Sequence, residues 1–208
     1  MNYVEYGKEN KYDDDIFFQK YSQMSRSQQG LAGAGEWETL RKLLPDFKDK
    51  RVLDLGCGYG WHCIYAMEHG ASSVVGVDIS HKMLEVAKEK THFPQVEYKC
   101  CAIEDVEFPE ESFDVILSSL AFHYVADYEI LVKKIYRILK SGGKLVFTVE
   151  HPVFTAYGTQ DWHYNEKGEI LHFPVDNYYY EGKRTAVFLG EKVTKYHRTL
   201  TTYLNTLL

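Results

Sequence analysis

The sequence lacks a long apolar stretch, a block of basic residues and any internal repeat or low-complexity tract. A membrane-spanning helix needs about 20 consecutive apolar residues, so none is expected. The formal net charge is −6, with 24 lysines and arginines against 30 acidic residues. Proteins that bind nucleic acid usually gather basic residues on one face, so we expect neither a nucleic-acid partner nor a membrane partner.

Cysteine is scarce, with four residues among 208: Cys57, Cys63, Cys100 and Cys101. None has the spacing to histidines that a zinc site needs, and the adjacent Cys100 and Cys101 are poorly placed for an ordinary disulfide. The simplest interpretation is four reduced thiols that fill small spaces in the core. We therefore expect no metal site and a cytoplasmic location.

The most informative stretch is VLDLGCGYG at residues 52–60, in which an apolar run is followed by three glycines at alternate positions. A short, continuous apolar run predicts a buried parallel strand. The glycines predict a tight turn over which a ligand lies against bare backbone, and residues 61–67 predict a helix whose free N–H groups face that ligand. The predicted cofactor cradle comprises Asp54, Gly56, Cys57, Gly58 and Gly60.

The glycine spacing does not match that of a dinucleotide site. The third glycine, Gly60, comes one position early, and Trp61 stands where the dinucleotide fingerprint has glycine. A nicotinamide-dependent oxidoreductase is therefore the alternative rather than the first choice. Asp78 ends a second apolar strand about 20 residues beyond the glycines, where a carboxylate can accept both hydroxyls of a ribose. Because Ser80 can cap the helix at 82–90, we expect Asp78 to bind ribose.

Strands and helices alternate along the chain. We predict strands at residues 51–55, 73–78, 96–100, 113–118 and 144–150, and helices at 35–44, 61–67, 82–90 and 128–140. This alternation predicts an α/β, doubly wound, parallel sheet with right-handed crossovers. Ligands of such sheets bind beyond the carboxyl ends of the strands. The acidic run Asp13–Asp15 is expected to be solvated surface.

Several segments together resemble the class I S-adenosylmethionine-dependent methyltransferases, in particular their small-molecule, type 11-like members. The segments are the D-x-G-x-G-x-G motif at 54–60, VVGVDIS at 74–80, FPEESFD at 108–114 and ILKSGG at 138–143. The resemblance implies a Rossmann-like, mostly parallel sheet of order 3-2-1-4-5 and S-adenosylmethionine as cofactor. It also implies transfer of a methyl group to a small molecule by in-line displacement. A non-catalytic S-adenosylmethionine-binding module is the second alternative.

The resemblance also implies further site residues. The family often carries an acid at the position of Ala102, so adenine is expected to use the backbone N–H of Ile103 with Glu104 or Asp105 as the carboxylate. The other expected cofactor residues are Ile79, Ser119, Tyr21 and Arg26, the last near the cofactor carboxylate.

Two histidines are candidate general bases, because imidazole titrates near neutrality. His123 follows the fourth predicted strand and His151 follows the fifth. A structural histidine is the alternative in each case, since methyl transfer often needs only alignment of the two reactants.

We expect one methyltransferase domain over 1–208, with an N-terminal cap at 1–33. The aromatic-rich segment 151–197 is expected to be a substrate lid or a hairpin packed on the sheet. The class I sheet ordinarily continues after strand five with a helix and two antiparallel strands. Because 199–208 is predicted as that helix, strands six and seven are expected to be missing. The exposed edge of 144–150 would then allow self-association, or 151–197 would cover it.

Overall fold

The computed structural model describes residues 8, 10–157 and 160–208, and it contains a five-stranded parallel sheet of order β3-β2-β1-β4-β5. The N-terminal cap expected at 1–33 therefore lies partly outside the described residues, as does a short piece of 151–197. The strands are β1 Arg51–Leu55, β2 Ser73–Asp78, β3 Val96–Cys100, β4 Phe113–Ser119 and β5 Leu139–Thr148. The predicted fold class and strand order are confirmed.

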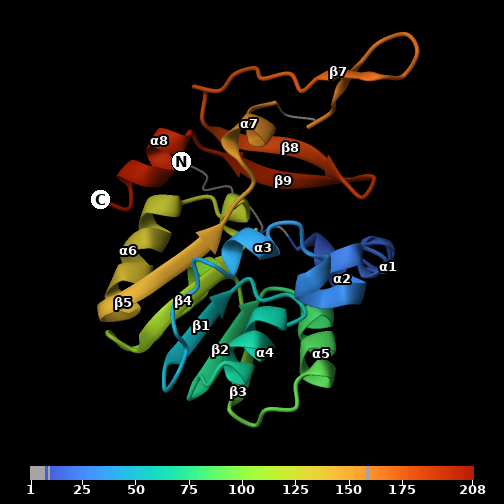
Figure 1. The fold of residues 1–208 in the computed structure, drawn as a ribbon. Coiled ribbons are helices and arrows are strands. Elements are labelled where there is room, and N and C mark those ends of the chain that lie inside the picture. The colour runs from blue at the N-terminus through green and yellow to red at the C-terminus, as the bar shows by residue number, and fades with distance from the viewer. Residues whose placement is uncertain (1–7, 9, 158–159) are drawn as a thin grey trace, which may run out of the picture.

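Two helices cover one face of the sheet and a third covers the other (Figure 1). The covering helices are α4 Trp61–Glu68, α5 His81–Lys90 and α6 Tyr128–Ile138. Alternate residues of β1 point to opposite faces, so Leu53 and Leu55 pack toward α6 while Val52 packs toward α4 and α5. Burial on both faces explains why the strands are continuous apolar runs.

Several predicted boundaries are wrong. The helix expected at 35–44 covers only α3, Trp37–Leu40, because Leu40 is buried while Leu43 is 65% exposed, so no continuous apolar face is packed. The helix expected to reach residue 140 ends at Ile138, and β5 spans Leu139–Thr148 rather than 144–150. Leu139 pairs with Phe113, and the register then shifts before Lys144 pairs with Val115.

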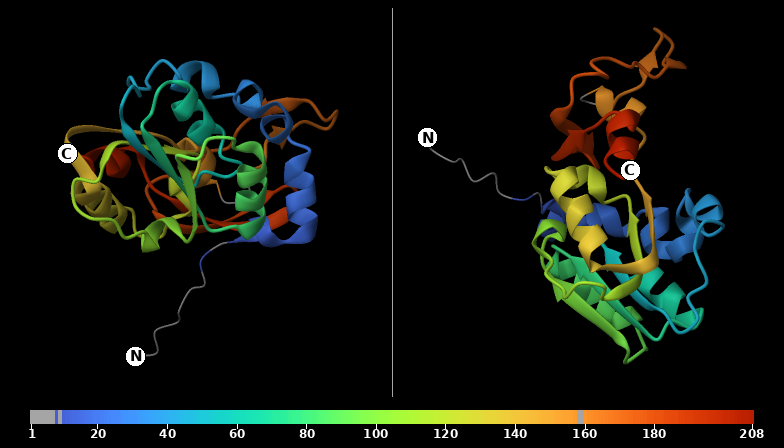
Figure 2. Two further views of the ribbon diagram at one scale, coloured as in Figure 1. Left: turned by 90° about the horizontal axis from the view of Figure 1, so that it is seen from below. Right: turned by 90° about the vertical axis from the view of Figure 1, so that its left-hand side faces the viewer.

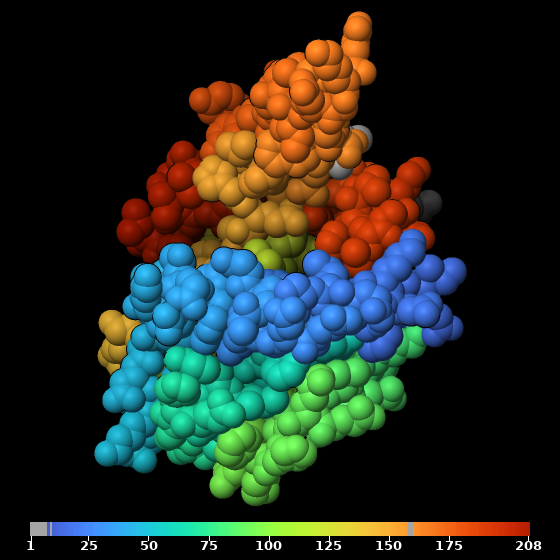
Figure 3. Space-filling view, turned by 45° about the vertical axis from the view of Figure 1, so that its right-hand side comes forward, coloured from blue at the N-terminus to red at the C-terminus, as the bar shows by residue number. Residues whose placement is uncertain are grey.

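The N-terminal segment lies between the sheet and the C-terminal hairpin, as the blue band in Figure 3 shows. Its elements are η1 Lys11–Asp13, α1 Asp15–Ser22, α2 Ser25–Gln29 and η2 Gly30–Gly33. The interpretation of Asp13–Asp15 as solvated surface is wrong for Asp13, which is half-buried, whereas Asp14 and Asp15 are exposed. Asp13 accepts hydrogen bonds from the Ser80 hydroxyl (2.6 Å) and the Lys82 N–H (3.1 Å) at the start of α5. Asp14 caps α1 by accepting from the Phe17 N–H.

The C-terminal part forms a second layer above the carboxyl ends of the strands (Figures 1 and 2). Its elements are α7 Pro152–Ala156, β6 His163–Tyr164, β7 Ile170–His172, β8 Gly182–Phe188, β9 Glu191–His197 and α8 Leu200–Asn205. Strands β8 and β9 form a hairpin. The guanidinium of Arg198 donates to the carbonyls of Val125 and Ala126 and so fastens the end of this hairpin to the loop after β4.

Within the described residues, β5 pairs with β4 alone, so its outer edge carries no further strand. The segment 151–197 does not cover this edge by pairing, because β6–β7 and β8–β9 are separate two-stranded sheets. Self-association through the edge stays a prediction. Among the described residues, no helix is long and apolar enough to cross a bilayer.

We expect Asp13→Ala to lower the free energy of unfolding by about 1–2 kcal/mol, because it removes acceptors for the first N–H groups of α5. Asp15→Ala is the matched control from the same acidic run. The Asp15 side chain is 96% exposed and forms an ion pair with Lys82, so its loss should cost under about 0.5 kcal/mol. Urea unfolding of both variants measures the difference, and equal losses would contradict the capping role.

Candidate functional site

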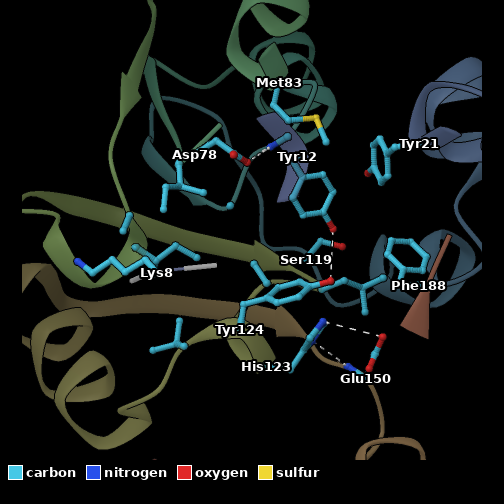
Figure 4. Close-up of a pocket in the computed structure, with 18 of the residues that line it drawn as sticks. Lys8, Tyr12, Tyr21, Asp78, Met83, Ser119, His123, Tyr124, Glu150 and Phe188 are labelled. Atoms are coloured by element: carbon cyan, nitrogen blue, oxygen red, sulfur yellow. Dashed lines mark hydrogen bonds and ion pairs between the residues drawn. The ribbon is translucent and has the colours of Figure 1, made fainter. Parts of the chain in front are cut away.

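A cavity of about 380 Å³ lies over the carboxyl ends of the parallel strands (Figure 4). Its wall is formed by the ends of β1, β2 and β4, by loops that follow β3 and β5, by the N-terminal segment, and by Phe188 of β8. Parallel strands bring these distant residues together because all their carboxyl ends meet at one edge.

The turn after β1 is fixed by the neighbouring strand. The N–H groups of Gly56 and Cys57 both donate to the carbonyl oxygen of Val77, at 2.8 and 2.9 Å. A Cβ at Gly56 would lie 2.5 Å from the Cβ of Ala121, so the turn has no room for a side chain there. Gly58 has φ +53°, and a Cβ on it would meet no protein atom within 4 Å. Gly58 also lines the cavity, so its bare backbone is open to a ligand.

Asp78 lines the same cavity from the end of β2. One carboxylate oxygen accepts from the Gly58 N–H at 2.8 Å and the other accepts from the Ser80 N–H at 2.9 Å. Ser80 itself caps α5 by accepting from the Met83 N–H. Burial raises the pKa of Asp78 to about 6, with the hydrogen bonds opposing the increase. The carboxylate of Asp78 is therefore placed to accept the hydroxyls of a ribose. The open backbone at Gly58 leaves room for the group attached to that ribose.

Three predicted cradle residues lie beneath the turn. Asp54 is 1% exposed and accepts from the Cys63 thiol at 3.5 Å, and burial raises its pKa to about 7. The side chain of Cys57 packs in the core. A Cβ at Gly60 would lie 2.1 Å from the hydroxyl of Tyr98, and its φ of +74° begins α4. The structure thus places these residues where they support the turn, and cofactor contact by them stays a prediction.

The residues expected around adenine lie along one side of the cavity. Ala102, Ile103 and Glu104 follow β3 and line the cavity with Ile79. The other candidate carboxylate, Asp105, forms an ion pair with Lys8. Of the two acids considered, Glu104 is therefore the one on the cavity wall.

Three further expected residues also line the cavity: Tyr21, Arg26 and Ser119. Glu36, which the sequence did not single out, contacts both Arg26 and Ser119. Arg26 forms an ion pair with Glu36, and the Ser119 hydroxyl donates to the same Glu36 oxygen at 3.1 Å. Burial opposes ionisation of Glu36, but its hydrogen bonds and the charge of Arg26 hold its pKa below the usual value. Glu36 therefore links Arg26 of α2 to Ser119 at the end of β4.

The two candidate histidines differ in position. His123 is 2% exposed and lines the cavity from η4, Phe122–Tyr124. Burial lowers its pKa to about 4, so the ring is neutral at neutral pH. His151 is exposed, and its Nδ1 accepts from the Val153 N–H at 3.2 Å as the cap of α7. Among the described residues, the cavity wall includes His123 and leaves out His151.

Aromatic rings line the cavity between its two ends. The hydroxyls of Tyr12 and Tyr124 lie 3.3 Å apart, as the dashed line in Figure 4 shows. Tyr12 also makes an edge-to-face contact with Tyr21 at a centroid distance of 5.2 Å. Phe188 of the C-terminal hairpin lies beside this group. The end beyond these rings is lined by Phe188, His123 and Glu150, and we call it the β5 end of the cavity.

Sequence reasoning missed Tyr12, Tyr124 and Glu150 as site residues. For Glu150 a signal existed, because it is the acid that ends a predicted parallel strand, as Asp78 is. Tyr124 adjoins a predicted site histidine. Tyr12 had no local signal, because its place depends on how the N-terminal segment packs against residues more than one hundred positions away.

Comparisons with known proteins agree with this geometry. The model of the methyltransferase domain family matches residues 53–147. A Listeria monocytogenes protein, solved as a candidate S-adenosylmethionine-dependent methyltransferase, is 58% identical, with a TM-score of 0.80 over 83% of this chain and 81% of that one. An S-adenosylmethionine-dependent methyltransferase from Mesorhizobium loti is 42% identical, with a TM-score of 0.79 over 86% and 81% of the two chains.

A relative of similar extent comes from Haemophilus influenzae. This uncharacterized protein is 37% identical over 210 residues, which cover 95% of the present chain and 80% of the relative. The matches favour a methyltransferase over the nicotinamide-dependent alternative, as the early third glycine does. With the glycine turn and the acid that ends β2, they establish that the chain belongs to the S-adenosylmethionine-dependent methyltransferases of class I fold, with S-adenosylmethionine as the cofactor.

Proposed function

We propose that the protein transfers the methyl group of S-adenosylmethionine to a small-molecule acceptor bound at the β5 end of the cavity. The observation that carries the proposal is a single cavity with the glycine turn and Asp78 at one end and His123 and Glu150 at the other. When bound, the cofactor supplies an electrophilic methyl group on its sulfonium. The chain then has to align an acceptor with that methyl group and to exclude water.

Each part of the chain has a separate task in this proposal. Asp78 and the backbone at Gly58 hold the nucleoside part, and Arg26 lies on the side where the cofactor carboxylate is expected. Tyr12, Tyr124 and Phe188 supply the apolar walls that exclude water from the acceptor. We propose that the N-terminal segment acts as a cap and that 151–197 acts as a lid, because both contribute residues to the cavity wall.

A small acceptor is favoured over a macromolecular one by how the cavity is bounded. The N-terminal segment passes on one side and the β8–β9 hairpin on the other (Figure 3), so an acceptor has to fit between them. Cavities of a few hundred Å³ usually hold small molecules. A module that binds the cofactor without turnover is the remaining alternative, and the following experiment separates the two.

Methyl-labelled S-adenosylmethionine is incubated with the protein and a small-molecule extract of cells, and label is sought in the extract. We expect transfer by the wild type and none by Gly58→Ala, whose methyl group enters the space over the turn. Gly142→Ala is the matched control, because Gly142 also has positive φ and open space but lies in β5, away from the cavity. Each substitution should cost about 1–2 kcal/mol of stability through its left-handed backbone. Cofactor binding without any transfer would support the non-catalytic module.

The affinity for S-adenosylhomocysteine should depend on pH through Asp78. The ionised carboxylate accepts the ribose hydroxyls, so affinity is expected to fall as the pH drops through about 6, the pKa of this group. Asp78→Asn should weaken binding at pH 8 by about 1–3 kcal/mol and remove the dependence near pH 6. Asp54→Asn is the control: burial beneath the turn raises the pKa of Asp54 to about 7, and this variant should keep the dependence near pH 6. Calorimetric titration from pH 5 to 8 measures this, and a dependence that survives in Asp78→Asn would contradict the ribose assignment.

His123 should matter more for turnover than His151. We expect His123→Gln to lower kcat by about tenfold or more, the scale of one hydrogen bond that positions a charged group on the cavity wall. His151→Gln should remain near the wild-type rate, because His151 is exposed and off the cavity wall. Initial rates with an acceptor found in the labelling experiment provide the comparison. Equal rates for His123→Gln and His151→Gln would contradict the expectation that the histidine on the cavity wall contributes more to turnover.

A further inference from the structure

We propose that Glu150 is the residue that binds the methyl acceptor, and that the buried Lys195 is a positioning residue that holds the Glu150 carboxylate toward the cavity. The acceptor is then a molecule that presents an N–H or O–H donor to this carboxylate rather than an anionic group. The assignment deepens the proposed function and rests on it for the presence of an acceptor at the β5 end.

Glu150 is the acid of the β5 end of the cavity. It follows β5, lines the cavity, and its side chain keeps 28% of its surface exposed. Figure 4 shows it at the opposite end of the labelled wall from Asp78, with the rings of Tyr12 and Tyr124 between them. A ligand held by Asp78 therefore leaves Glu150 to a second molecule.

Two residues that are not part of the cavity wall, Lys195 and Gln160, hold this carboxylate in place. Lys195 of β9 forms an ion pair with Oε1 of Glu150 and donates to the side-chain oxygen of Gln160 at 2.9 Å. The Gln160 amide in turn donates to Oε2 of Glu150 at 2.9 Å. The Lys195 side chain is only 3% exposed, and a lysine is almost never buried so completely unless its charge is paired. The ion pair between Lys195 and Glu150 thus links the β8–β9 hairpin to the cavity wall.

Both ring nitrogens of His123 lie near atoms of Glu150. Its Nδ1 accepts from the Glu150 backbone N–H at 3.4 Å, and its Nε2 lies 4.0 Å from Oε1 of the same residue. In a neutral ring whose Nδ1 accepts, the proton sits on Nε2, which then faces the carboxylate. Neither nitrogen offers a lone pair to the cavity in this arrangement. His123 therefore orients Glu150, and its substitution is expected to act through Glu150.

The charges around Glu150 favour its ionised form. Burial raises the pKa of Glu150, but the charges of His123 when protonated and of Lys195, with hydrogen bonds from Lys195 and Gln160, leave it below its usual value. Because His123 is neutral at neutral pH, the ion pair with Lys195 is the charge contact that favours the Glu150 carboxylate there. Other charged or titratable groups nearby include Tyr124, whose ring centroid lies 4.5 Å from that of His123, Arg198, whose charge acts on His123, and Tyr203, which interacts electrostatically with Glu150.

The hydrogen-bond capacity of Glu150 then fixes the acceptor chemistry. The two oxygens of a carboxylate have about four lone-pair sites, and Lys195 and Gln160 use two of them. The ionised carboxylate can still accept from an N–H or O–H of a ligand, whereas a ligand carboxylate or phosphate would meet a like charge without a donor. The rings of Tyr12, Tyr124 and Phe188 suit a flat, largely apolar body on that ligand.

The first test is the titration of Glu150 in the intact chain, followed by NMR of side chains labelled with ¹³C at the glutamate carboxyl. We expect Lys195→Met to raise the titration midpoint of Glu150 by about one pH unit or more, and Lys195→Arg to restore it. Lys192→Met removes an exposed charge from the same strand and should leave the midpoint unchanged. An unmoved midpoint in Lys195→Met would overturn the positioning role. No cofactor is needed, so this result is separate from any failure of the proposed function.

The second test uses three probes that share one unsubstituted ring and differ in their terminal group: phenethylamine, 2-phenylethanol and phenylacetate. Binding is measured with the protein saturated by S-adenosylhomocysteine, whose own affinity is measured first. We expect phenethylamine and 2-phenylethanol, which carry an N–H or O–H donor, to bind about tenfold tighter than phenylacetate, the scale of one hydrogen bond to a charged group. Glu150→Gln should remove this preference while leaving the affinity for S-adenosylhomocysteine unchanged. A preference for phenylacetate, or an order unaltered by Glu150→Gln, would overturn the assignment.

Discussion

Two N–H groups of the turn after β1, those of Gly56 and Cys57, donate to one carbonyl oxygen at the end of β2, that of Val77. The next N–H, that of Gly58, donates to Asp78. The glycine turn and the acid are therefore one hydrogen-bonded unit, held by the parallel pairing of β1 with β2. Because a Cβ at Gly56 would strike Ala121, the same turn also sets how closely the loop after β4 approaches. The rest of the cavity is built around this unit.

The sequence predicted this unit and the sheet because their signals are local. Buried strands are short apolar runs, glycines mark the turn, and the spacing of Asp78 from Gly58 follows from one strand–helix–strand repeat. Glu150 obeyed the same rule for acids at strand ends and could have been found by it. The short length of α3 could not be predicted in this way, since the exposure of Leu43 depends on how the rest of the chain packs around it.

The ends of the chain were less predictable because their contacts are distant in sequence. Asp13 binds Ser80, the N-cap residue of α5, from 67 positions away, and Lys195 reaches Glu150 across 45. A run of three acids looks like solvated surface unless its partner is known. A lysine in a hairpin with alternating polar residues looks exposed, yet the pairing that buries Lys195 exists only after the hairpin has docked. Both contacts link a terminal segment to the carboxyl ends of the strands, where the sheet alone would leave the site open.

The cavity beside the glycine turn binds S-adenosylmethionine rather than a dinucleotide. Isothermal titration of the wild-type chain with S-adenosylhomocysteine, and separately with NAD⁺, measures this selectivity. We expect one saturable site for S-adenosylhomocysteine and no heat of binding for NAD⁺ at the same concentrations. Binding of NAD⁺ at that site with S-adenosylhomocysteine excluded would refute the assignment of the cofactor.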